Sequence, residues 1–423
     1  MTTTAAPQIK MGEPVLRWSA RARSIADVEK ELARIWAHQD LTVSDVQGDG
    51  PPGRHIAART SVMNLVVIAR RPEIAERAAA TIQALTGRHP SRTIVVQSAD
   101  PDGPSWVDAH VEAHCVLPRA DAPEICAETI QLTAGGEAGR HLSAIVTPLI
   151  VHDLPTTVWW PGEPPFATRA AQELLSSADR LVVDGSSWGG DGLTRLREMA
   201  SLLDTSRLAI SDFALVRQSR WREAIASIFD DPDFLPFLRS LRRIAVTYAT
   251  HDESGAPGST NIVKPLYHVA WLASRLGLSV VKPLTTIAGP ASAAAANRGR
   301  LVPGARPVIG RGAAATLSDG RAEISVVVRP VVSALPAGTT LRVELLAERR
   351  GQELRADVTA EAESVHVHVW WDGVEVLDRQ FLAARRADVD LLAEAIEAGR
   401  RDRVTTGTLA SAAALIGPGG GTT

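Results

Sequence analysis

One stretch of the sequence, Gln131 to Pro165, constrains the fold most, because it holds two strand-like runs joined by glycines and a helical pattern. Apolar residues recur at helical spacing from Arg140 to His152, and a β-rich run follows from Thr156 to Trp160. The stretch therefore predicts a βαβ unit in which three glycines supply the turn. These glycines are Gly135, Gly136 and Gly139.

Two functional interpretations of this stretch are open. In the first, the GGEAG turn presents backbone N–H groups to a phosphate, and Arg140 adds positive charge at the helix start. The turn also has a purely structural explanation, because its spacing matches neither GxGxxG nor the P-loop. In the second, Trp159, Trp160 and Pro161 form an exposed aromatic ledge that docks on another protein.

Length and composition predict a globular protein of two or three domains, since the chain has 423 residues of which 45% are hydrophobic. Lys and Arg total 45 against 48 acidic residues, which argues against a nucleic-acid or anionic-membrane binder. No apolar run approaches the roughly 20 residues that span a bilayer, and the N-terminus lacks the apolar core of a signal peptide. A cytoplasmic location is therefore expected.

The first half of the chain has the pattern of an α/β fold. Residues 1–52 are expected to form an N-terminal arm and helix, and residues 53–250 an α/β domain with a mixed sheet. Besides the opening stretch, this domain should contain a second βαβ unit. Its expected elements are a strand from Val62 to Ala69, a helix from Pro72 to Leu85 and a strand from Thr93 to Gln97.

Residues 251–423 are expected to form an α+β domain with an antiparallel sheet and a disordered tail. A helix from Asp388 to Ala398 should cover one face of that sheet, and residues 287–319 should run over the surface. The expected strands are Glu323 to Pro330, Thr340 to Ala347, Glu353 to Thr359, Ser364 to Trp371 and Val374 to Phe381, with a turn at Asp372-Gly373.

The segment GSSWG, Gly185 to Gly189, matches the GxSxG pattern that places a nucleophilic serine on a tight turn in α/β-hydrolases. Ser187 would be the nucleophile. Gly190, Asp191 and Gly192 separate it from the next helix, whereas a nucleophile elbow needs that helix to begin at once. A flexible βα loop is the alternative.

Two pairs of histidines share a strand face and are weighed as metal ligands. His110 and His114 flank Glu112, and His366 and His368 alternate on a later strand. Neither pair has a further ligand close in sequence, so half-solvated polar strand faces explain both pairs more simply. No metal is expected.

Cys115 and Cys126 face each other if the runs Trp106 to Leu117 and Ile125 to Thr133 form a hairpin. Cys115 lies on the apolar face of its strand, which favours two buried free thiols over a disulfide. A redox switch is the alternative interpretation.

Three segments resemble the OpcA family of glucose-6-phosphate dehydrogenase assembly proteins. They are HPSR at His89 to Arg92, the run from Cys126 to Pro165, and DRLVVDGSSW at Asp179 to Trp188. They occur in order at the expected separations, which makes the resemblance more specific than any short motif above.

The resemblance implies a non-catalytic protein that binds glucose-6-phosphate dehydrogenase and promotes its active oligomeric state, without a cofactor. The alternative is an α/β enzyme or a nucleotide or sugar-phosphate binder that uses the Gly135 to Gly139 loop or Ser187. A docking surface is expected to be anchored by aromatic and arginine side chains. The candidate partner-binding residues are His89, Arg92, Trp159, Trp160, Pro161 and Trp188.

Overall fold

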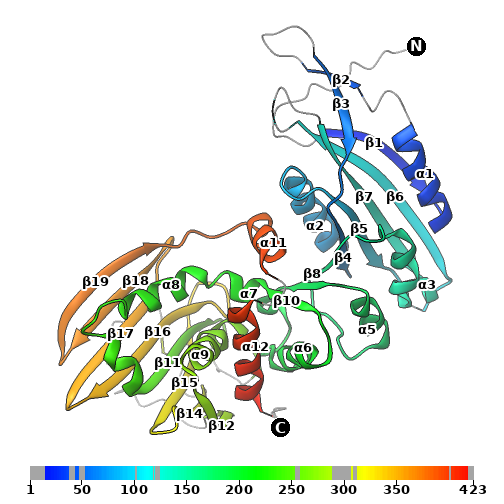
Figure 1. The fold of residues 1–423 in the computed structure, drawn as a ribbon. Helices are drawn as coiled ribbons and strands as arrows, with labels where there is room; N and C mark the ends of the chain where they lie inside the picture. The colour runs from blue at the N-terminus through cyan, green and yellow to red at the C-terminus, as the bar shows by residue number, and fades with distance from the viewer. Residues whose placement is uncertain are drawn as a thin grey trace. The chain divides into compact units, whose positions relative to one another are not determined.

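The structure, a computed structural model, divides the chain into two compact units (Figure 1). The first unit holds Met1–Val183 and Ala387–Glu397, and the second holds Asp184–Arg386 and Ala398–Thr423. The residues that the structure describes are 15–37, 43–46, 53–100, 102–117, 119, 124–252, 258–287, 306–307, 312–399 and 402–417.

The first unit is built on a mixed sheet. Its strands are β1 (Val15–Ala22), β2 (Val43–Val46), β3 (Gly53–Arg59), β4 (Met63–Ala69), β5 (Ser91–Ser98), β6 (Trp106–Val116), β7 (Glu124–Gly135), β8 (Thr156–Trp160) and β9 (Arg180–Val183). Within this unit the strand order runs β1-β6-β7-β5-β4-β8-β9, and β3 with its partner β2 joins beside β7. β7, β5, β4, β8 and β9 are parallel neighbours, whereas β6 is antiparallel to β1 and β7.

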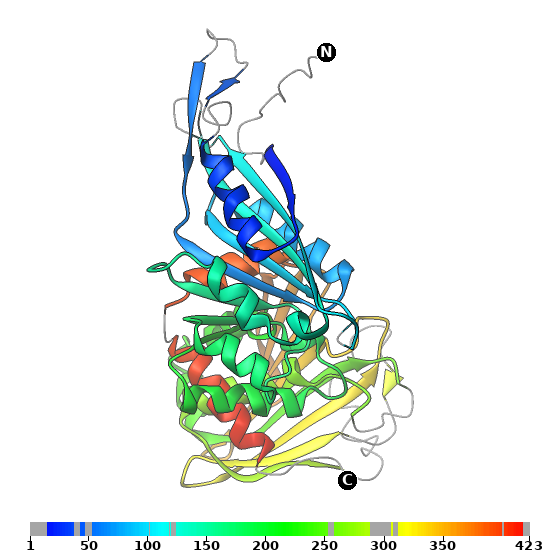
Figure 2. The same ribbon diagram turned by 90° about the vertical axis from the view of Figure 1, so that its right-hand side faces the viewer.

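Helices cover both faces of this sheet. They are α1 (Ile25–Ala37), α2 (Pro72–Leu85), α3 (Gly136–Arg140), α4 (Leu142–Val146), the 3-10 turn η2 (Thr147–Leu149) and α5 (Arg169–Ser176). Figures 1 and 2 show α1 and α2 on opposite faces. All seven residues of β4 are buried, as expected for a parallel strand that is covered on both sides. No helix in the described part of the chain is long and apolar enough to span a membrane.

The helix expected from Arg140 to His152 is broken. His141, between α3 and α4, has φ −107° and ψ 63°, which lies outside the helical region. Pro148 then lies in the η2 turn, and Ile150 is extended. The expected βαβ unit is present, but its crossover consists of short helical turns.

The second unit is built on a sheet of order β12-β14-β15-β11-β16-β17-β18-β19. Its strands are β11 (Leu241–Thr250), β12 (Ser279–Thr286), β14 (Ala313–Ser318), β15 (Glu323–Val332), β16 (Thr340–Arg349), β17 (Gln352–Ala360), β18 (Ser364–Trp371) and β19 (Val374–Leu382), with β13 (Arg306–Pro307) beside β15. The five strands expected after residue 320 are confirmed. β11 pairs in parallel with β15, which makes the sheet mixed, while the other neighbours are antiparallel.

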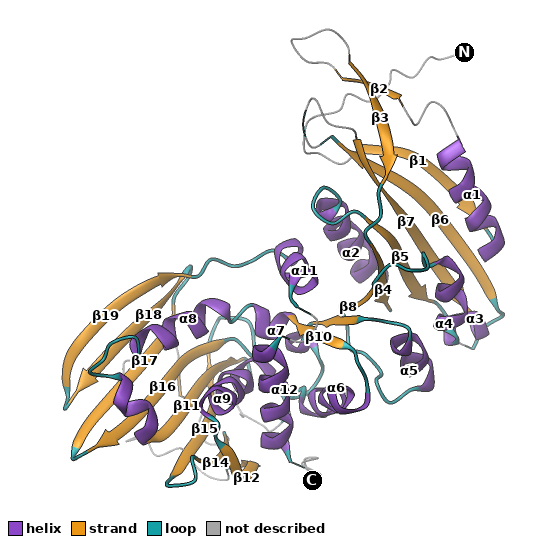
Figure 3. Ribbon diagram, viewed as in Figure 1, coloured by secondary structure: helices purple, strands orange, loops and turns teal. Residues whose placement is uncertain are grey.

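Helices of the second unit lie against this sheet and around β10 (Ala209–Asp212). They are η3 (Gly185–Ser187), α6 (Leu193–Thr205), α7 (Phe213–Val216), α8 (Ser219–Ile228), η4 (Leu235–Ser240), α9 (Val263–Leu276) and α12 (Arg403–Ile416). α8 contacts β17, β18 and β19, while α9 contacts β11, β15 and β16, so both cover the same sheet (Figure 3).

The helix α11 (Asp388–Glu397) does not cover the second sheet, which corrects the expectation for this helix. It belongs to the first unit and packs on α2. Arg77 lies 3.0 Å from Asp388, and the Arg88 guanidinium donates two hydrogen bonds of 2.8 and 2.9 Å to Glu397. Sequence periodicity shows that the helix is amphipathic, but it does not show which apolar surface the helix meets.

Three further expectations need correction. Residues 287–319 are not wholly a surface excursion, because β13 and β14 lie within them; residues 288–305 lie outside the described part. The sequence predicts a frayed tail from Leu415 onward, but Leu415 and Ile416 are buried residues of α12. The strand β1 precedes the expected N-terminal helix.

The expected domain ranges stay a prediction about folding units. Contacts within the structure divide the chain after Val183, whereas the sequence places a boundary near Thr250.

Candidate functional site

The first unit contains a pocket of about 330 Å³ at the carboxyl ends of β4, β5 and β8. β4 is where the strand order reverses, because β5 lies on one side of it and β8, which follows later in the chain, on the other. In doubly wound sheets, ligands bind outside the carboxyl ends of the strands at this reversal. The lining residues are Ile68, Ala69, Arg70, Val96, Ser98, Gly139, Arg140, Leu142, Trp160, Pro165, Thr168, Ala170 and Ala171.

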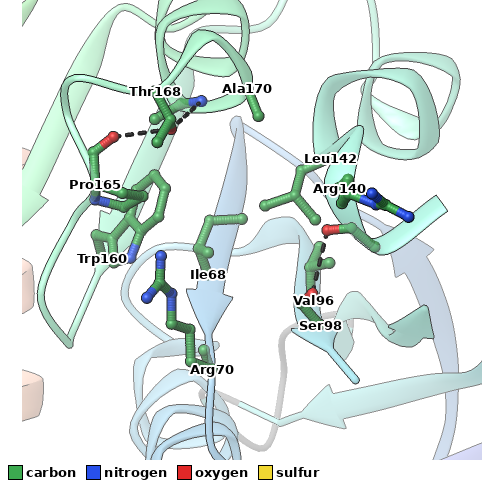
Figure 4. A pocket seen from close by; sticks show the side chains of 13 residues that line it. Ile68, Arg70, Val96, Ser98, Arg140, Leu142, Trp160, Pro165, Thr168 and Ala170 are labelled. Carbon is green, nitrogen blue, oxygen red and sulfur yellow. Dashed lines mark hydrogen bonds between the residues drawn. The ribbon is translucent and has the colours of Figure 1, made fainter. Parts of the chain in front are cut away.

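Figure 4 shows how the side chains lie in this pocket. Arg70 extends from the end of β4 toward the Trp160 ring, whereas Arg140 points outward. The hydroxyl groups in the lining are already used: Ser98 donates to the Gly139 carbonyl at 3.1 Å, and Thr168 donates to the Pro165 carbonyl at 2.9 Å. Arg70, which faces the Trp160 ring, is therefore the charged side chain that a ligand in this pocket would meet.

The loop after β4 reads Arg70-Arg71-Pro72 and contains no glycine. In dinucleotide-binding folds this loop carries glycines, because their backbone must approach the pyrophosphate closely. A bulky arginine pair with a proline at the first turn of α2 does not permit that approach. The mostly apolar lining and the arginine suit a smaller ligand that carries one anionic group and a flat or apolar body.

The glycines of the predicted phosphate turn serve close packing. Gly136 has φ +56°, and its N–H donates to the Asp100 carbonyl at 2.9 Å. A Cβ on Gly139 would lie 2.6 Å from the Ala134 carbonyl oxygen, and one on Gly135 would lie 2.3 Å from the Trp106 ring nitrogen. The turn therefore needs glycine for structural reasons, while Gly139 and Arg140 also line the pocket.

The tryptophans predicted to form a docking ledge lie in the core. Trp159 is 0%, Trp160 2% and Trp188 3% exposed, and Pro161 is also buried. The strand β8, which carries Trp159 and Trp160, is covered on both faces, so both of these rings are enclosed. A ring this buried offers no surface to a partner while the fold is intact. Trp160 reaches the pocket instead.

The other two predicted anchors are paired inside the first unit. Arg92 is 6% exposed and donates to Glu128 at 2.8 Å and to the Leu149 carbonyl at 3.0 Å. His89 lies 2.9 Å from Glu397 of α11, which Arg88 also binds. Both residues hold elements together, and their contact with a partner stays a prediction.

Ser187 lies in η3, and its hydroxyl donates to the Asp184 carbonyl at 2.8 Å. The chain is extended at Trp188, and α6 begins only at Leu193. A nucleophile elbow needs the helix N-terminus directly after the serine to stabilise the oxyanion. The arrangement therefore favours the βα-loop interpretation of GSSWG.

A buried acid that the sequence did not single out lies beneath this loop. Asp212 accepts hydrogen bonds from the Tyr267 hydroxyl at 2.6 Å and from the backbone N–H of Gly185 and Ala214. Burial, followed by the nearby Asp184 charge, raises the pKa of Asp212 to about 6. Asp184 itself is bound by Arg217 at 2.8 Å. These hydrogen bonds around Asp212 fix the loop. The partners of Asp212 lie far apart in the sequence, so local sequence patterns do not reveal the cluster.

The two histidine pairs differ in their surroundings. His110 is engaged by Ser19 at 2.9 Å and by Glu112 at 3.2 Å, while His114 is buried and lies 3.1 Å from Gln83. Desolvation lowers the pKa of His114. His366 and His368, by contrast, converge with Asp378 from the neighbouring strand, an acid that is not close to them in sequence.

Cys115 and Cys126 form a disulfide, which corrects the prediction of two free thiols. The predicted hairpin is present, and its register places the two cysteines opposite each other. Trp36 packs against the bridge. Apolar burial alone does not distinguish a thiol pair from a disulfide, since both are small and apolar.

The fold and the pocket define a two-unit α/β protein whose doubly wound sheet carries a ligand-sized pocket. Family models described as the N-terminal and C-terminal domains of a glucose-6-phosphate dehydrogenase subunit match residues 82–201 and 208–406. The chain belongs to the OpcA family.

Two curated relatives carry the provisional name OxPP cycle protein OpcA. The protein from Synechocystis is 30% identical over 171 residues, which cover 40% of this chain and 34% of the relative. The protein from Synechococcus elongatus is 28% identical over 177 residues, which cover 42% of this chain and 37% of the relative. The matched part thus spans about a third of each relative.

Solved structures resemble the chain only distantly. An oxidoreductase from Sinorhizobium meliloti has a TM-score of 0.44 at 12% identity and covers 83% of this chain and 95% of its own. The transcriptional regulator Gal80p from Kluyveromyces lactis has a TM-score of 0.40 at 10% identity, with coverage of 81% and 86%. Similarity at this level carries no argument about function.

Replacing Trp160 with alanine should lower the free energy of unfolding by about 3 to 5 kcal/mol, because it removes a buried ring from the core. Trp106→Ala is the matched control: its ring is 42% exposed, so we expect a loss of about 1 kcal/mol. Urea denaturation followed by circular dichroism measures both. Equal losses for the two variants would contradict the core position of Trp160.

Asp212 should make stability depend on pH. The folded chain keeps the Asp212 proton up to about pH 6, whereas the unfolded chain loses it near 3.8, so unfolding free energy falls as pH rises between these values. The fall is about 3 kcal/mol at most. Asp212→Asn is neutral and should lack this fall, so its stability relative to the parent should rise between pH 4 and pH 7. An unchanged difference in denaturation midpoints at the two pH values would contradict the raised pKa.

Proposed function

We propose that the protein acts in the cytoplasm as a non-catalytic partner of glucose-6-phosphate dehydrogenase that promotes the active oligomeric state of that enzyme. The observation that carries the proposal is the match of two dehydrogenase-subunit family models to residues 82–201 and 208–406. The curated relatives, named as OxPP cycle proteins, support a role in the oxidative pentose phosphate pathway.

Activation of an enzyme by a binding partner requires a difference in affinity between enzyme states. A partner that binds the active oligomer tenfold more tightly than the inactive form shifts the equilibrium by about 1.4 kcal/mol. This role needs a contact surface and no catalytic group. The loop interpretation of GSSWG is consistent with such a role, because the Ser187 hydroxyl is bound within its own turn.

The strand β19 supplies a surface suited to this contact. It is the last strand in the order of the second sheet, so one side of its backbone has no strand neighbour among the described residues. Val374 is 67%, Val376 47% and Leu382 75% exposed, which is a high exposure for three large apolar side chains on one short strand. Exposed apolar sheet edges pair readily with another protein. We take the dehydrogenase as the occupant because of the family match.

The pocket in the first unit supports a second function for the same protein, the binding of a small anionic ligand. Arg70 faces the Trp160 ring across a mostly apolar lining, and no ion pair or hydrogen bond engages Arg70 within the described residues. A sugar phosphate or a mononucleotide combines one anion with an apolar or flat body, as the lining requires. Such a ligand could adjust the contact with the dehydrogenase.

Added to its cognate glucose-6-phosphate dehydrogenase, the full chain should raise the enzyme's rate or its substrate affinity in a saturable manner. Val374→Lys should reduce the apparent affinity for the enzyme at least tenfold, because it places a charge in the apolar edge. Val62→Lys is the matched control, since Val62 is 51% exposed and lies on the first unit. The measurement is the initial rate at increasing chain concentration.

No change in rate or substrate affinity at saturating chain would contradict the proposed function. If the two valine variants lowered the apparent affinity equally, activation would stand but the assignment of β19 would be wrong.

Arg70→Ala should weaken the binding of a sugar phosphate or nucleotide at least tenfold, since one charge-assisted hydrogen bond contributes about 1.5 to 3 kcal/mol. Arg71→Ala is the matched control, because Arg71 is adjacent and exposed but does not line the pocket. Isothermal titration with glucose 6-phosphate and with adenosine 5′-phosphate measures both variants. Absence of binding to the parent chain, or equal losses in both variants, would contradict the pocket assignment.

A further inference from the structure

Two histidines and an aspartate converge on the hairpin formed by β18 and β19. His366 and His368 share one face of β18, and their ring centroids lie 4.2 Å apart. Asp378 of β19 lies directly opposite His368. The ligand atoms of the three side chains all lie within 4.8 Å of one another. Three such groups at this separation match the donor set of a transition-metal site.

A β-bulge creates this convergence. After the Asp372-Gly373 turn the strands pair as Trp371 with Val374 and Trp370 with Glu375, but the next pair is Val369 with Leu377. Val376 is therefore an extra residue on β19. Without it the continuing register would place Leu377 opposite His368, and the aspartate would lie on the other face of the sheet.

Each imidazole is already oriented by a glutamate. Glu361 lies 3.2 Å from Nδ1 of His366, and Glu375 lies 2.6 Å from Nδ1 of His368. Metal-binding histidines almost always have their second ring nitrogen held by such a group, which fixes the tautomer and the ring direction.

The other ring nitrogen of His366 faces the third member of the set. Nε2 of His366 lies 2.5 Å from Asp378. A metal ion bound between these two groups would take the place of this hydrogen bond. The two imidazoles are surrounded by three carboxylates, those of Glu361, Glu375 and Asp378. The cluster therefore carries net negative charge, which attracts a cation.

We propose that His366, His368 and Asp378 bind a divalent transition-metal ion of the zinc type on the second sheet. Two nitrogen ligands disfavour Mg²⁺ and Ca²⁺, which prefer oxygen, whereas Zn²⁺ accepts nitrogen and carboxylate ligands together. Three protein ligands leave the fourth tetrahedral position to water or to a group from another molecule. The side chains of both histidines are about a quarter exposed, so an ion can reach them.

Isothermal titration of the tag-free, chelator-treated full chain with ZnCl₂ tests the site. The parent chain should bind one ion at this site with micromolar or tighter affinity. His368→Gln should weaken the binding at least thirtyfold, because it removes a direct ligand. Glu375→Gln leaves all three ligands in place and should weaken binding by about tenfold through the orientation of His368 alone.

His110→Gln is the matched control, because His110 also shares a strand face with a second histidine and a glutamate but lies in the first unit. It should leave the affinity unchanged. Circular dichroism and thermal melting of each variant establish that the fold is intact. The visible spectrum of the Co²⁺-loaded parent should show tetrahedral coordination that His368→Gln loses. Binding weaker than about 100 µM in the parent, or equal losses in His110→Gln and His368→Gln, would overturn the proposal.

Discussion

The buried ion pair between Arg92 and Glu128 is the interaction on which the first unit depends most. The two residues are direct partners on the adjacent parallel strands β5 and β7, with side chains 7% and 0% exposed. Trp36 of α1 also donates to Glu128, and Arg92 donates to the Leu149 carbonyl. The pair therefore fixes the segment that leads into β8, and with it the Trp160 wall of the pocket. Removing one member alone would leave a buried charge unpaired, at a cost of about 3 to 5 kcal/mol.

The first unit is completed by a helix that is distant in sequence. The chain leaves this unit after Val183 and returns at Ala387 to form α11 on α2. Of the HPSR segment, which carries the family resemblance, His89 lies 2.9 Å from Glu397 of α11 and Arg92 pairs with Glu128, so both residues make contacts within the first unit. The first unit is therefore assembled from two separate segments of the sequence, Met1–Val183 and Ala387–Glu397. The two family models, over residues 82–201 and 208–406, cover part of each unit.

Most elements were predictable because their periodicity is local, whereas the sites depend on partners that periodicity does not specify. The alternation in Ser364 to Trp371 placed His366 and His368 on one face, but only the bulge at Val376 brings Asp378 to them. The same limit applies to the burial of Trp160, because a short β-rich run has the same sequence pattern whether one or both faces of its strand are covered. The pocket arises where three strand ends meet, which local periodicity does not show, although Gly139 and Arg140 of the predicted phosphate turn line it. The family was predictable because long ordered segments carry more information than short motifs.

The proposed role predicts a physical complex, and sedimentation velocity tests this most directly. Cognate glucose-6-phosphate dehydrogenase would be sedimented alone, and then with a molar excess of the full chain, at the concentration used for activity. The account predicts one faster boundary that contains both proteins, with a mass that requires a larger or more populated dehydrogenase oligomer. Two independent boundaries at their separate positions, with the dehydrogenase mass unchanged, would contradict the account.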